Sequence, residues 1–378
     1  MTSALPLIFV RRSYSSFGGG ELLLQRTMQQ MRARGRDVSI ISRDWAELDG
    51  IRSLPVRPRW VPRTFRARAF SKAVCDILRG SPPAIVQSNE RVLCCDILRC
   101  GDGVHAAYLA RRAAHIGLRG RLMQNISPFH HEMVRLERAA FASPRLKAVI
   151  AISEMVKRDI EQAFDVDGKL LVHIPNGVDL QRFTPALRDF HRHETRQRLR
   201  ADPTANVLLF VGSGFARKGL ATAIQAIARM RDGSELWVAG SDSRISRYKH
   251  LAEHLGVGPR IRFLGGVRDM LPIYGAVDAA VLPSLYEPFG TAVLEGMACG
   301  LPVAVSSDCG AAEAVSQFDP RLIAETGSVD ALANAIRRAF DHASDASAKA
   351  SSRSVAESYG LDTMVDRMLD LYDSMEMG

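Results

Sequence analysis

The sequence predicts an α/β fold made of two Rossmann-like domains. Short apolar strands alternate with helical stretches along the chain, and this alternation begins again near its middle. The length of 378 residues also exceeds what one typical core needs. A composition of 47% hydrophobic and 24% charged residues is ordinary for a globular protein, so the chain can bury two cores.

The first half opens with an apolar strand at residues 5–10. A helix then runs to about Arg34, because Leu24, Met28 and Met31 fall on one helical face and Gly35 ends it. Further apolar segments, with helical stretches between them, indicate buried strands. These segments are residues 38–42, 84–87, 95–99, 148–152 and 171–175.

The second half repeats the scheme, and a polar, arginine-rich stretch at residues 188–206 leads into it. Its strands are predicted at residues 206–212, 236–240, 261–264, 279–282 and 301–305, with helices at 219–230 and 291–299. A last amphipathic stretch has an apolar stripe at helical spacing, which predicts core packing rather than a site. The predicted division of the chain is 1–183, 184–360 and 361–378.

Apolar runs and cysteines indicate a cytoplasmic protein. No run of eighteen apolar residues occurs, and the first apolar strand is followed rather than preceded by Arg11 and Arg12, unlike a signal peptide. The six cysteines show no Cys-x-x-Cys spacing and mostly lie in apolar runs, which predicts buried thiols in a reducing compartment without structural zinc. They are Cys75, Cys94, Cys95, Cys100, Cys299 and Cys309.

Positive charge is concentrated in the first half. Residues 1–180 hold 28 Lys and Arg against 17 Asp and Glu, whereas residues 181–378 hold 22 against 24. The basic stretch 52–72 contains no acid and interleaves Trp60, Phe65 and Phe70. This pattern fits an anionic membrane surface, and it fits a solvated arginine-rich face equally well. No nucleic-acid-binding module accompanies the charge, so a nucleic acid partner is not expected.

Two carboxylates, Glu287 and Glu295, lie across a predicted strand-to-helix turn. Ligands bind at this carboxyl end of the strands in open α/β sheets. Free backbone amides of Phe289, Gly290 and Thr291 at the helix start suit a phosphate, whereas carboxylates accept hydrogen bonds and suit hydroxyls. Glu295 is placed for a ribose diol and Glu287 for the hydroxyls of a second sugar. The segment therefore predicts a site for a nucleotide sugar.

The same segment, Pro-Ser-x-x-Glu-Pro-Phe-Gly followed by Glu-x-Met-Ala-Cys-Gly-Leu-Pro-Val, resembles a motif of the retaining GT-B glycosyltransferases. This large group 1 family includes glycogen-synthase-like and lipopolysaccharide-core enzymes. The resemblance extends over nearly the whole chain and is nearest to the lipopolysaccharide-core glucosyltransferases. It implies two Rossmann-like domains facing across a cleft, the first for the acceptor and the second for the donor. It also implies that the C-terminal helix crosses back to the first domain.

The loop at residues 212–219 brings Arg217 and Lys218 between a strand and a helix, where a diphosphate can sit. Arg217 replaces the third glycine of a dinucleotide fingerprint. Lys218 is followed by Gly219 rather than Ser or Thr, which excludes a P-loop. In the resembled family an Arg and a Lys of this loop bind the donor diphosphate, and Arg217 and Lys218 match them.

Other candidates lie near the first domain. Gly18, Gly19 and Glu21 match the family's Gly-Gly-x-Glu loop, which faces the donor, although a glycine run alone fits a flexible loop equally well. Asp102 and His105 follow the strand at 95–99, where the family places a polar residue beside the reacting sugar. An Asp between two glycines also fits a turn. The family's inter-domain junction matches residues 176–183, and Arg182 is a lesser donor-binding candidate there.

The sequence predicts no required metal and no other cofactor. The Asp165-Val-Asp167 string precedes a glycine and is interpreted as a turn rather than a metal site. The string from His130 to Glu132 lacks the spacing of a zinc enzyme. Arg217 and Lys218 are then expected to take the place of a metal at the diphosphate.

These observations predict a metal-independent, retaining hexosyltransferase at the inner face of the cytoplasmic membrane. It would move a hexose, with glucose as the first choice, from a UDP-sugar to a cell-envelope glycan such as the lipopolysaccharide core. As the resemblance implies, the departing diphosphate takes the acceptor proton. The candidate catalytic residues are Asp102, His105, Arg217, Lys218 and Glu287. The alternatives are a GT-B-fold nucleotide-sugar epimerase and a catalytically silent, nucleotide-sugar-binding membrane scaffold.

Overall fold

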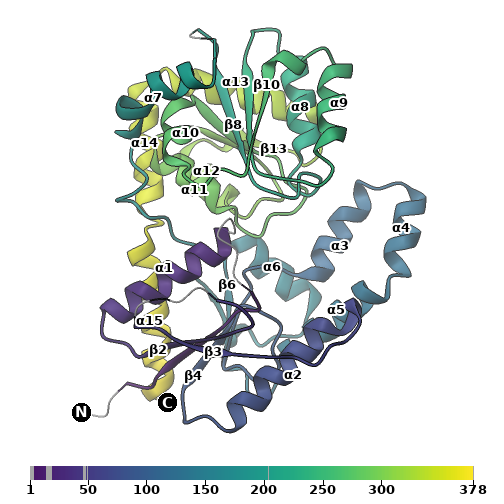
Figure 1. Cartoon of the computed structure of the whole chain (residues 1–378), viewed down its shortest axis with the longest axis vertical. Coiled ribbons are helices and arrows are strands. Elements are labelled where there is room, and N and C mark those ends of the chain that lie inside the picture. Colours follow the sequence, from purple (N-terminus) through teal and green to yellow (C-terminus); the bar gives the residue numbers. More distant parts are fainter. Residues whose placement is uncertain (1–3, 14–18, 46–47, 49, 203, 378) are drawn as a thin grey trace. The chain divides into compact units, whose positions relative to one another are not determined.

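A computed structural model describes residues 4–13, 19–45, 48, 50–202 and 204–377. The chain forms two compact units: unit 1 is Met1–Pro175 together with Asp362–Gly378, and unit 2 is Asn176–Leu361 (Figure 1). The division falls after Pro175, upstream of the sequence-based boundary between residues 183 and 184. The reason is local, because the segment that begins with Gly177 already packs on Leu361 of unit 2.

Unit 1 is built on a seven-stranded sheet in the order β3-β2-β1-β4-β5-β6-β7. All neighbouring strands run parallel, and the inner strands are buried, as expected for a sheet flanked by helices. The strands are β1 Leu7–Val10, β2 Val38–Ser42, β3 Arg52–Pro55, β4 Ile85–Ser88, β5 Ile97–Arg99, β6 Ala148–Ala151 and β7 Leu171–His173. The edge strand β3, exposed at most positions, starts the basic stretch and was not predicted from its sequence.

Six helices of unit 1 connect these strands. They are α1 Gly19–Ala33, α2 Arg66–Arg79, α3 His105–Ala114, α4 Leu118–Asn125, α5 Pro128–Phe141 and α6 Glu154–Ala163. Ser127 and Ser153 cap α5 and α6, because their side chains accept backbone N–H groups of the first turn.

The C-terminal helix α15, Leu361–Met377, belongs to unit 1 beyond its first residue. It buries Met364, Val365, Met368 and Tyr372, and the Tyr372 hydroxyl donates to Gln87 Oε1 of β4 at 2.7 Å. Two arginines of unit 1 add ion pairs to its exposed side. These pairs are Arg34 with Asp362 and Asp366, and Arg36 with Asp373 and Glu376.

Unit 2 is built on a six-stranded parallel sheet in the order β10-β9-β8-β11-β12-β13. The strands are β8 Val207–Val211, β9 Glu235–Ala239, β10 Ile261–Gly265, β11 Ala279–Leu282, β12 Val303–Ser306 and β13 Ile323–Ala324. The helices are α7 Leu187–Arg198, α8 Leu220–Arg229, α9 Ile245–His254, α10 Leu271–Ala276, α11 Thr291–Ala298, α12 Ala312–Phe318, α13 Val329–Ala343 and α14 Ala346–Glu357.

Each sheet has one switch point, where the order of the strands reverses. The candidate sites lie at these two points. In unit 1 the reversal lies between β1 and β4, and in unit 2 it lies between β8 and β11. Loops at the carboxyl ends of such strand pairs splay apart and form the ligand-binding crevice of a doubly wound sheet. The loops that follow these four strands carry most of the charged side chains discussed below.

The cysteines differ from the sequence-based expectation of buried thiols. Cys75 of α2 and Cys94, which follows β4, form a disulfide with a Cα–Cα distance of 5.7 Å. The other four cysteines are free and buried, as expected. The sequence carried no signal for the bridge, because its two partners are 19 residues apart and come together only through the packing of α2.

Candidate active site

The loop after β8 and the loop after β11 bring three predicted residues of unit 2 into contact. Arg217 Nη1 donates to Glu287 Oε2 at 2.9 Å, and Lys218 Nζ donates to the same oxygen at 2.8 Å. Arg217 also donates to the backbone carbonyl of Tyr286. Two cations and one anion leave the cluster with a net positive charge, which suits it to a multiply charged anion.

Glu287 is ionised in this position. Burial by itself would raise its pKa, but the charges and hydrogen bonds of Lys218 and Arg217 outweigh burial and lower the pKa to about 2. The side chain is only 12% exposed. From the sequence, Glu287 is predicted to bind sugar hydroxyls and the two cations to bind a diphosphate. The structure shows that Glu287 also holds both cations in place.

Two glycines allow these loops to approach each other. Gly219 has φ +75°, and a Cβ atom there would lie 1.9 Å from the carbonyl oxygen of Pro283 in the opposite loop. Gly290 has φ +92°, and its Cβ would lie 2.8 Å from Leu282 and 3.2 Å from Glu287. Only glycine combines this backbone conformation with such close contacts.

The first turn of α11 offers backbone donors beside this cluster. Within the described chain, the amide N–H groups of Phe289, Gly290 and Thr291 have no hydrogen-bond acceptor. Unpaired amides at a helix N-terminus, together with the helix dipole, favour an anion. The structure therefore places the predicted phosphate-binding amides and the predicted cations in loops that leave one sheet at its switch point.

Glu295 lies one turn further along α11 and is half-buried. Its Oε2 accepts a hydrogen bond of 2.8 Å from the hydroxyl of Tyr274. Tyr274 is a positioning residue that sequence analysis missed, because one tyrosine in an otherwise apolar helix has the pattern of a core residue. Burial, followed by the charge of Glu295, raises the pKa of Tyr274 well above its ordinary value, so its hydroxyl remains a donor.

Arg182 stands apart from these residues in the described structure. Its guanidinium pairs with Asp269 at 3.6 Å and packs over the ring of Phe183. It contacts none of Arg217, Lys218 and Glu287 through any interaction of the described residues, so its donor-binding role stays a prediction.

In unit 1, Arg11 joins two predicted residues. It directly follows β1 and pairs with Glu21 at 2.9 Å, with Glu90 at 3.7 Å and with Asp102 at 3.4 Å. Gly19 begins α1, while Gly18 lies outside the described residues. Arg11 and Glu90 were not predicted as site residues, although both follow strands at the switch point, and that position could have indicated them.

His105 lies at the start of α3 and does not contact Asp102 through any interaction of the described residues. Its Nε2 lies 3.0 Å from Nδ1 of His130, and its backbone N–H donates to Glu137. Burial, the charge of Arg91 and the neighbouring His130 lower the pKa of His105 to about 4. The ring is therefore neutral near pH 7, with one nitrogen that donates a hydrogen bond and one that accepts.

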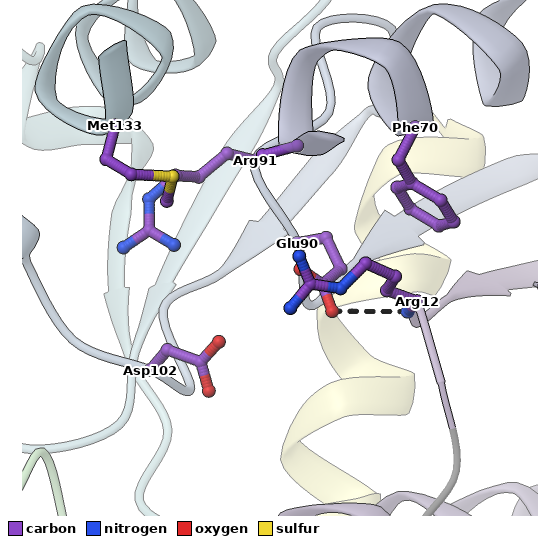
Figure 2. Close-up of a pocket in the computed structure, with 7 residues that line it drawn as sticks. Arg12, Phe70, Glu90, Arg91, Asp102 and Met133 are labelled. Atoms are coloured by element: carbon purple, nitrogen blue, oxygen red, sulfur yellow. Dashed lines mark hydrogen bonds between the residues drawn. The ribbon is translucent and has the colours of Figure 1, made fainter. Parts of the chain in front are cut away.

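A small cavity at this switch point is lined by acidic and basic side chains. Figure 2 shows Arg12, Glu90, Arg91 and Asp102 around it, with Phe70 and Met133 on its walls. Its volume is about 190 Å³. The backbone N–H of Arg12 donates to Glu90 Oε1 at 3.1 Å, which fixes the chain at the point where the Arg12 side chain leaves it.

Metal-ligating residues do not gather in the described part of the chain. No three His, Cys, Asp or Glu side chains there could hold an ion together. Asp167 of the Asp165-Val-Asp167 string caps a short 3-10 turn, where its side chain accepts the N–H of Lys169 at 2.9 Å.

Doubly wound units with basic loops at their switch points define a class of nucleotide-binding proteins. Family models narrow this class. The model described as Glycosyltransferase Family 4 matches residues 17–182, and the model described as Glycosyl transferases group 1 matches residues 191–354. The chain belongs to the group 1 glycosyltransferases.

Individual relatives agree with this family. The chain is 25% identical over 340 residues to the lipopolysaccharide glucosyltransferase WaaG of Escherichia coli K12, covering 88% of each chain. It matches the crystal structure of WaaG with a TM-score of 0.82 and 22% identity over 97% of this chain and 99% of that one. It also matches Anabaena HepE in complex with UDP and glucose, with a TM-score of 0.74 and 18% identity over 98% and 100% of the chains. The fold is GT-B.

None of the described helices has an apolar segment long enough to cross a membrane.

Proposed function

We propose that this glycosyltransferase moves glucose, with retention of configuration, from UDP-glucose to a glycan of the cell envelope such as the lipopolysaccharide core. The observation that carries the proposal is the Arg217–Lys218–Glu287 cluster beside the free amides of α11. The choice of sugar and acceptor is supported by the relatives, since one is a lipopolysaccharide glucosyltransferase and another was solved with UDP and glucose.

In the proposed reaction the diphosphate gains negative charge as the glycosidic bond opens. Arg217, Lys218 and the amides of residues 289–291 stabilise this charge, and preorganised donors of this kind supply a large part of catalysis. The two fixed cations make a metal ion unnecessary in this proposal. Glu287 orients the cations and offers its remaining oxygen to the transferred sugar, while Glu295 accepts the ribose hydroxyls. Gly18, Gly19, Glu21 and Arg182 remain predicted donor contacts.

Unit 1 is proposed to bind the acceptor. Asp102 is half-exposed on its side-chain surface and lines the small cavity, so an acceptor hydroxyl can reach its carboxylate. His105 is neutral and hydrogen-bonded to His130, which suits it to orienting a hydroxyl rather than to neutralising charge. Both groups are proposed to contact the reacting sugars.

The proposed place of the enzyme is the inner face of the cytoplasmic membrane. The basic stretch 52–72 supports it, because all seven of its cations are exposed and Trp60 is 85% exposed beside them. An envelope glycan built on a lipid would be presented at the same surface.

A donor screen tests the proposed function. Thermal shift and slow donor hydrolysis are measured with UDP-, GDP- and ADP-hexoses, each with and without a chelator. We expect UDP-glucose to raise the melting temperature and to be hydrolysed in the presence of chelator. Conversion of the donor to an epimer would support the epimerase, and failure of every donor to bind would contradict the proposal.

The variant Glu295→Ala tests the donor geometry. Removing a carboxylate that accepts ribose hydroxyls should weaken UDP-glucose binding about tenfold or more in calorimetry, because hydrogen bonds to a charged acceptor are strong. Glu253→Ala, which removes an exposed glutamate of α9 in the same unit, is the matched control and should bind normally. Unchanged affinity in Glu295→Ala would refute the assignment.

A further inference from the structure

A groove in unit 1, here called the arginine groove, is lined by six arginines and, among the described residues, by no acidic one. Its volume is about 690 Å³, which is within the range of sites that bind a small molecule or an oligosaccharide. The loop after β3, the start of α2 and the loops after β1 and β2 supply the cations. They are Arg12, Arg43, Arg57, Arg59, Arg63 and Arg66.

The protein balances little of the charge of these arginines, although the guanidinium of Arg12 interacts electrostatically with Glu90. All six side chains are exposed, and none forms an ion pair with a carboxylate in the part of the chain that is described. By contrast, Arg68 of the same stretch pairs with Glu132. Six neighbouring cations repel one another. A ligand that brings negative charge would relieve this repulsion.

The side chains of the groove select a particular chemistry. Guanidinium groups bind phosphate and carboxylate oxygens through two parallel hydrogen bonds, which a point charge cannot do. Arg63 lies over the ring of Phe129, with its central carbon 5.6 Å from the ring centre, so this guanidinium is partly oriented in advance. The exposed ring of Trp60 offers a flat apolar face on which a sugar ring can pack.

The arginine groove adjoins the small cavity of Figure 2. Arg12 and Phe70 line both hollows, so they form the wall between them. The other side of the small cavity is bordered by Asp102, a proposed acceptor contact. A chain of sugars that presents a hydroxyl near Asp102 would therefore extend past Arg12 into the arginine groove.

We propose that the acceptor is a polyanionic glycan, with at least two phosphate or carboxylate groups on the sugars adjoining the one that receives the hexose. The arginine groove binds these anionic groups. This inference rests on the proposed function, because it names the substrate class of the proposed acceptor side. The groove is hollowed rather than flat, which favours an oligosaccharide over a bilayer surface as its occupant.

Calorimetry with a lipid-free, phosphorylated lipopolysaccharide-core oligosaccharide tests the proposal. The double variant Arg57→Ala/Arg59→Ala removes two groove cations and should weaken binding about tenfold or more. The matched control Arg52→Ala/Lys72→Ala removes the same charge from the same basic stretch, outside the groove lining, and should stay within about twofold of wild type. Equal losses in both double variants would overturn the proposal.

Chemical treatment of the oligosaccharide identifies the anionic group. Loss of binding after phosphatase digestion assigns phosphate, and loss after esterification assigns carboxylate. Binding that survives both treatments would overturn the inference. If Arg57→Ala/Arg59→Ala weakens binding to phosphatidylcholine vesicles containing phosphatidylglycerol but leaves oligosaccharide binding unchanged, the inference is overturned in favour of a membrane surface. If the same variant weakens binding only to a single-stranded oligonucleotide, it is overturned in favour of nucleic acid.

A UDP-glucose titration separates this inference from the proposed function. The groove variants should bind UDP-glucose like wild type, which also shows that they are folded. Failure of wild type to bind any donor would count against the proposed function. If wild type binds UDP-glucose normally but does not bind the oligosaccharide, only the proposed role of the arginine groove is contradicted.

Discussion

The carboxylate of Glu287 stays charged in a mostly buried position because Arg217 and Lys218 share its Oε2 atom. Removing both cations would leave a partly desolvated charge without a partner, which is costly. The ion pairs therefore fix the positions of both cations before any donor arrives. Preorganised charge of this kind needs little rearrangement during the reaction.

The variant Glu287→Gln tests this arrangement through pH. The pKa of Glu287 lies near 2 in the folded chain against 4.5 as the ordinary value, so the charge stabilises the fold above pH 4.5. This contribution, about 3 kcal/mol at most, disappears as pH falls from 4.5 towards 2. Urea unfolding should show wild type more stable than Glu287→Gln near pH 7, with the difference shrinking below pH 4.5. Glu253→Gln is the control, and a pH-independent difference would contradict the prediction.

Individual residues of the site could be predicted from the sequence only where they lie within a recognisable motif. Arg217, Lys218, Glu287 and Glu295 lie in motif segments, and the structure places them around one switch point. The ion pairs among them join residues far apart in sequence, so spacing could not reveal them. Tyr274 and Arg11 carried no motif, and their roles depend on partners that only the fold brings near.

At the scale of elements, the buried strands were predictable because parallel strands covered on both faces are short apolar runs. Helix α7 could not be predicted in the same way, because its sequence is rich in arginine and histidine and has the pattern of a polar connecting stretch. Three arginines of α7, Arg188, Arg192 and Arg196, pair with Asp278 before β11. The helix thus owes its place to tertiary ion pairs that a local pattern does not contain.

The close approach of the loops after β8 and β11 makes Gly219 sensitive to substitution. Gly219→Ala should cost more than about 1 kcal/mol of unfolding free energy, because a positive φ and a backbone clash with Pro283 act together. It should also weaken UDP-glucose binding by moving Lys218 away from Glu287. Gly256→Ala is the matched control, since Gly256 has φ +70° but open space around its Cβ. Equal stability losses in chemical denaturation would show that the clash is unimportant.

At the scale of the whole molecule, unit 1 is discontinuous and unit 2 is one continuous segment. The segments around Val178 and Gly360 lie side by side, because the N–H of Val178 donates to the carbonyl of Tyr359 and the carbonyl of Val178 accepts the N–H of Leu361. The family resemblance implied a division of this kind, with the last helix returning to the first domain. Its exact position depends on the packing of Gly177 against Leu361, which the sequence does not display.

A chain that ends at Gly360 should lose the fold of unit 1 and keep that of unit 2. It lacks the buried side chains of Met364, Val365, Met368 and Tyr372, whose burial contributes about 6–12 kcal/mol, comparable with the stability of a whole domain. Limited proteolysis should then cut unit 1 rapidly while residues 176–360 persist. Rapid cleavage of both units, or of neither, would contradict the expectation.

The return of α15 to unit 1 also sets an order of events on the ribosome. The segment 1–175 is synthesised first, yet its sheet still lacks the helix that covers Gln87 and Arg99. Unit 2 emerges next as a continuous chain and can complete its fold by itself. Helix α15 is synthesised after unit 2, so the part of the protein that is made first is the part that finishes folding last.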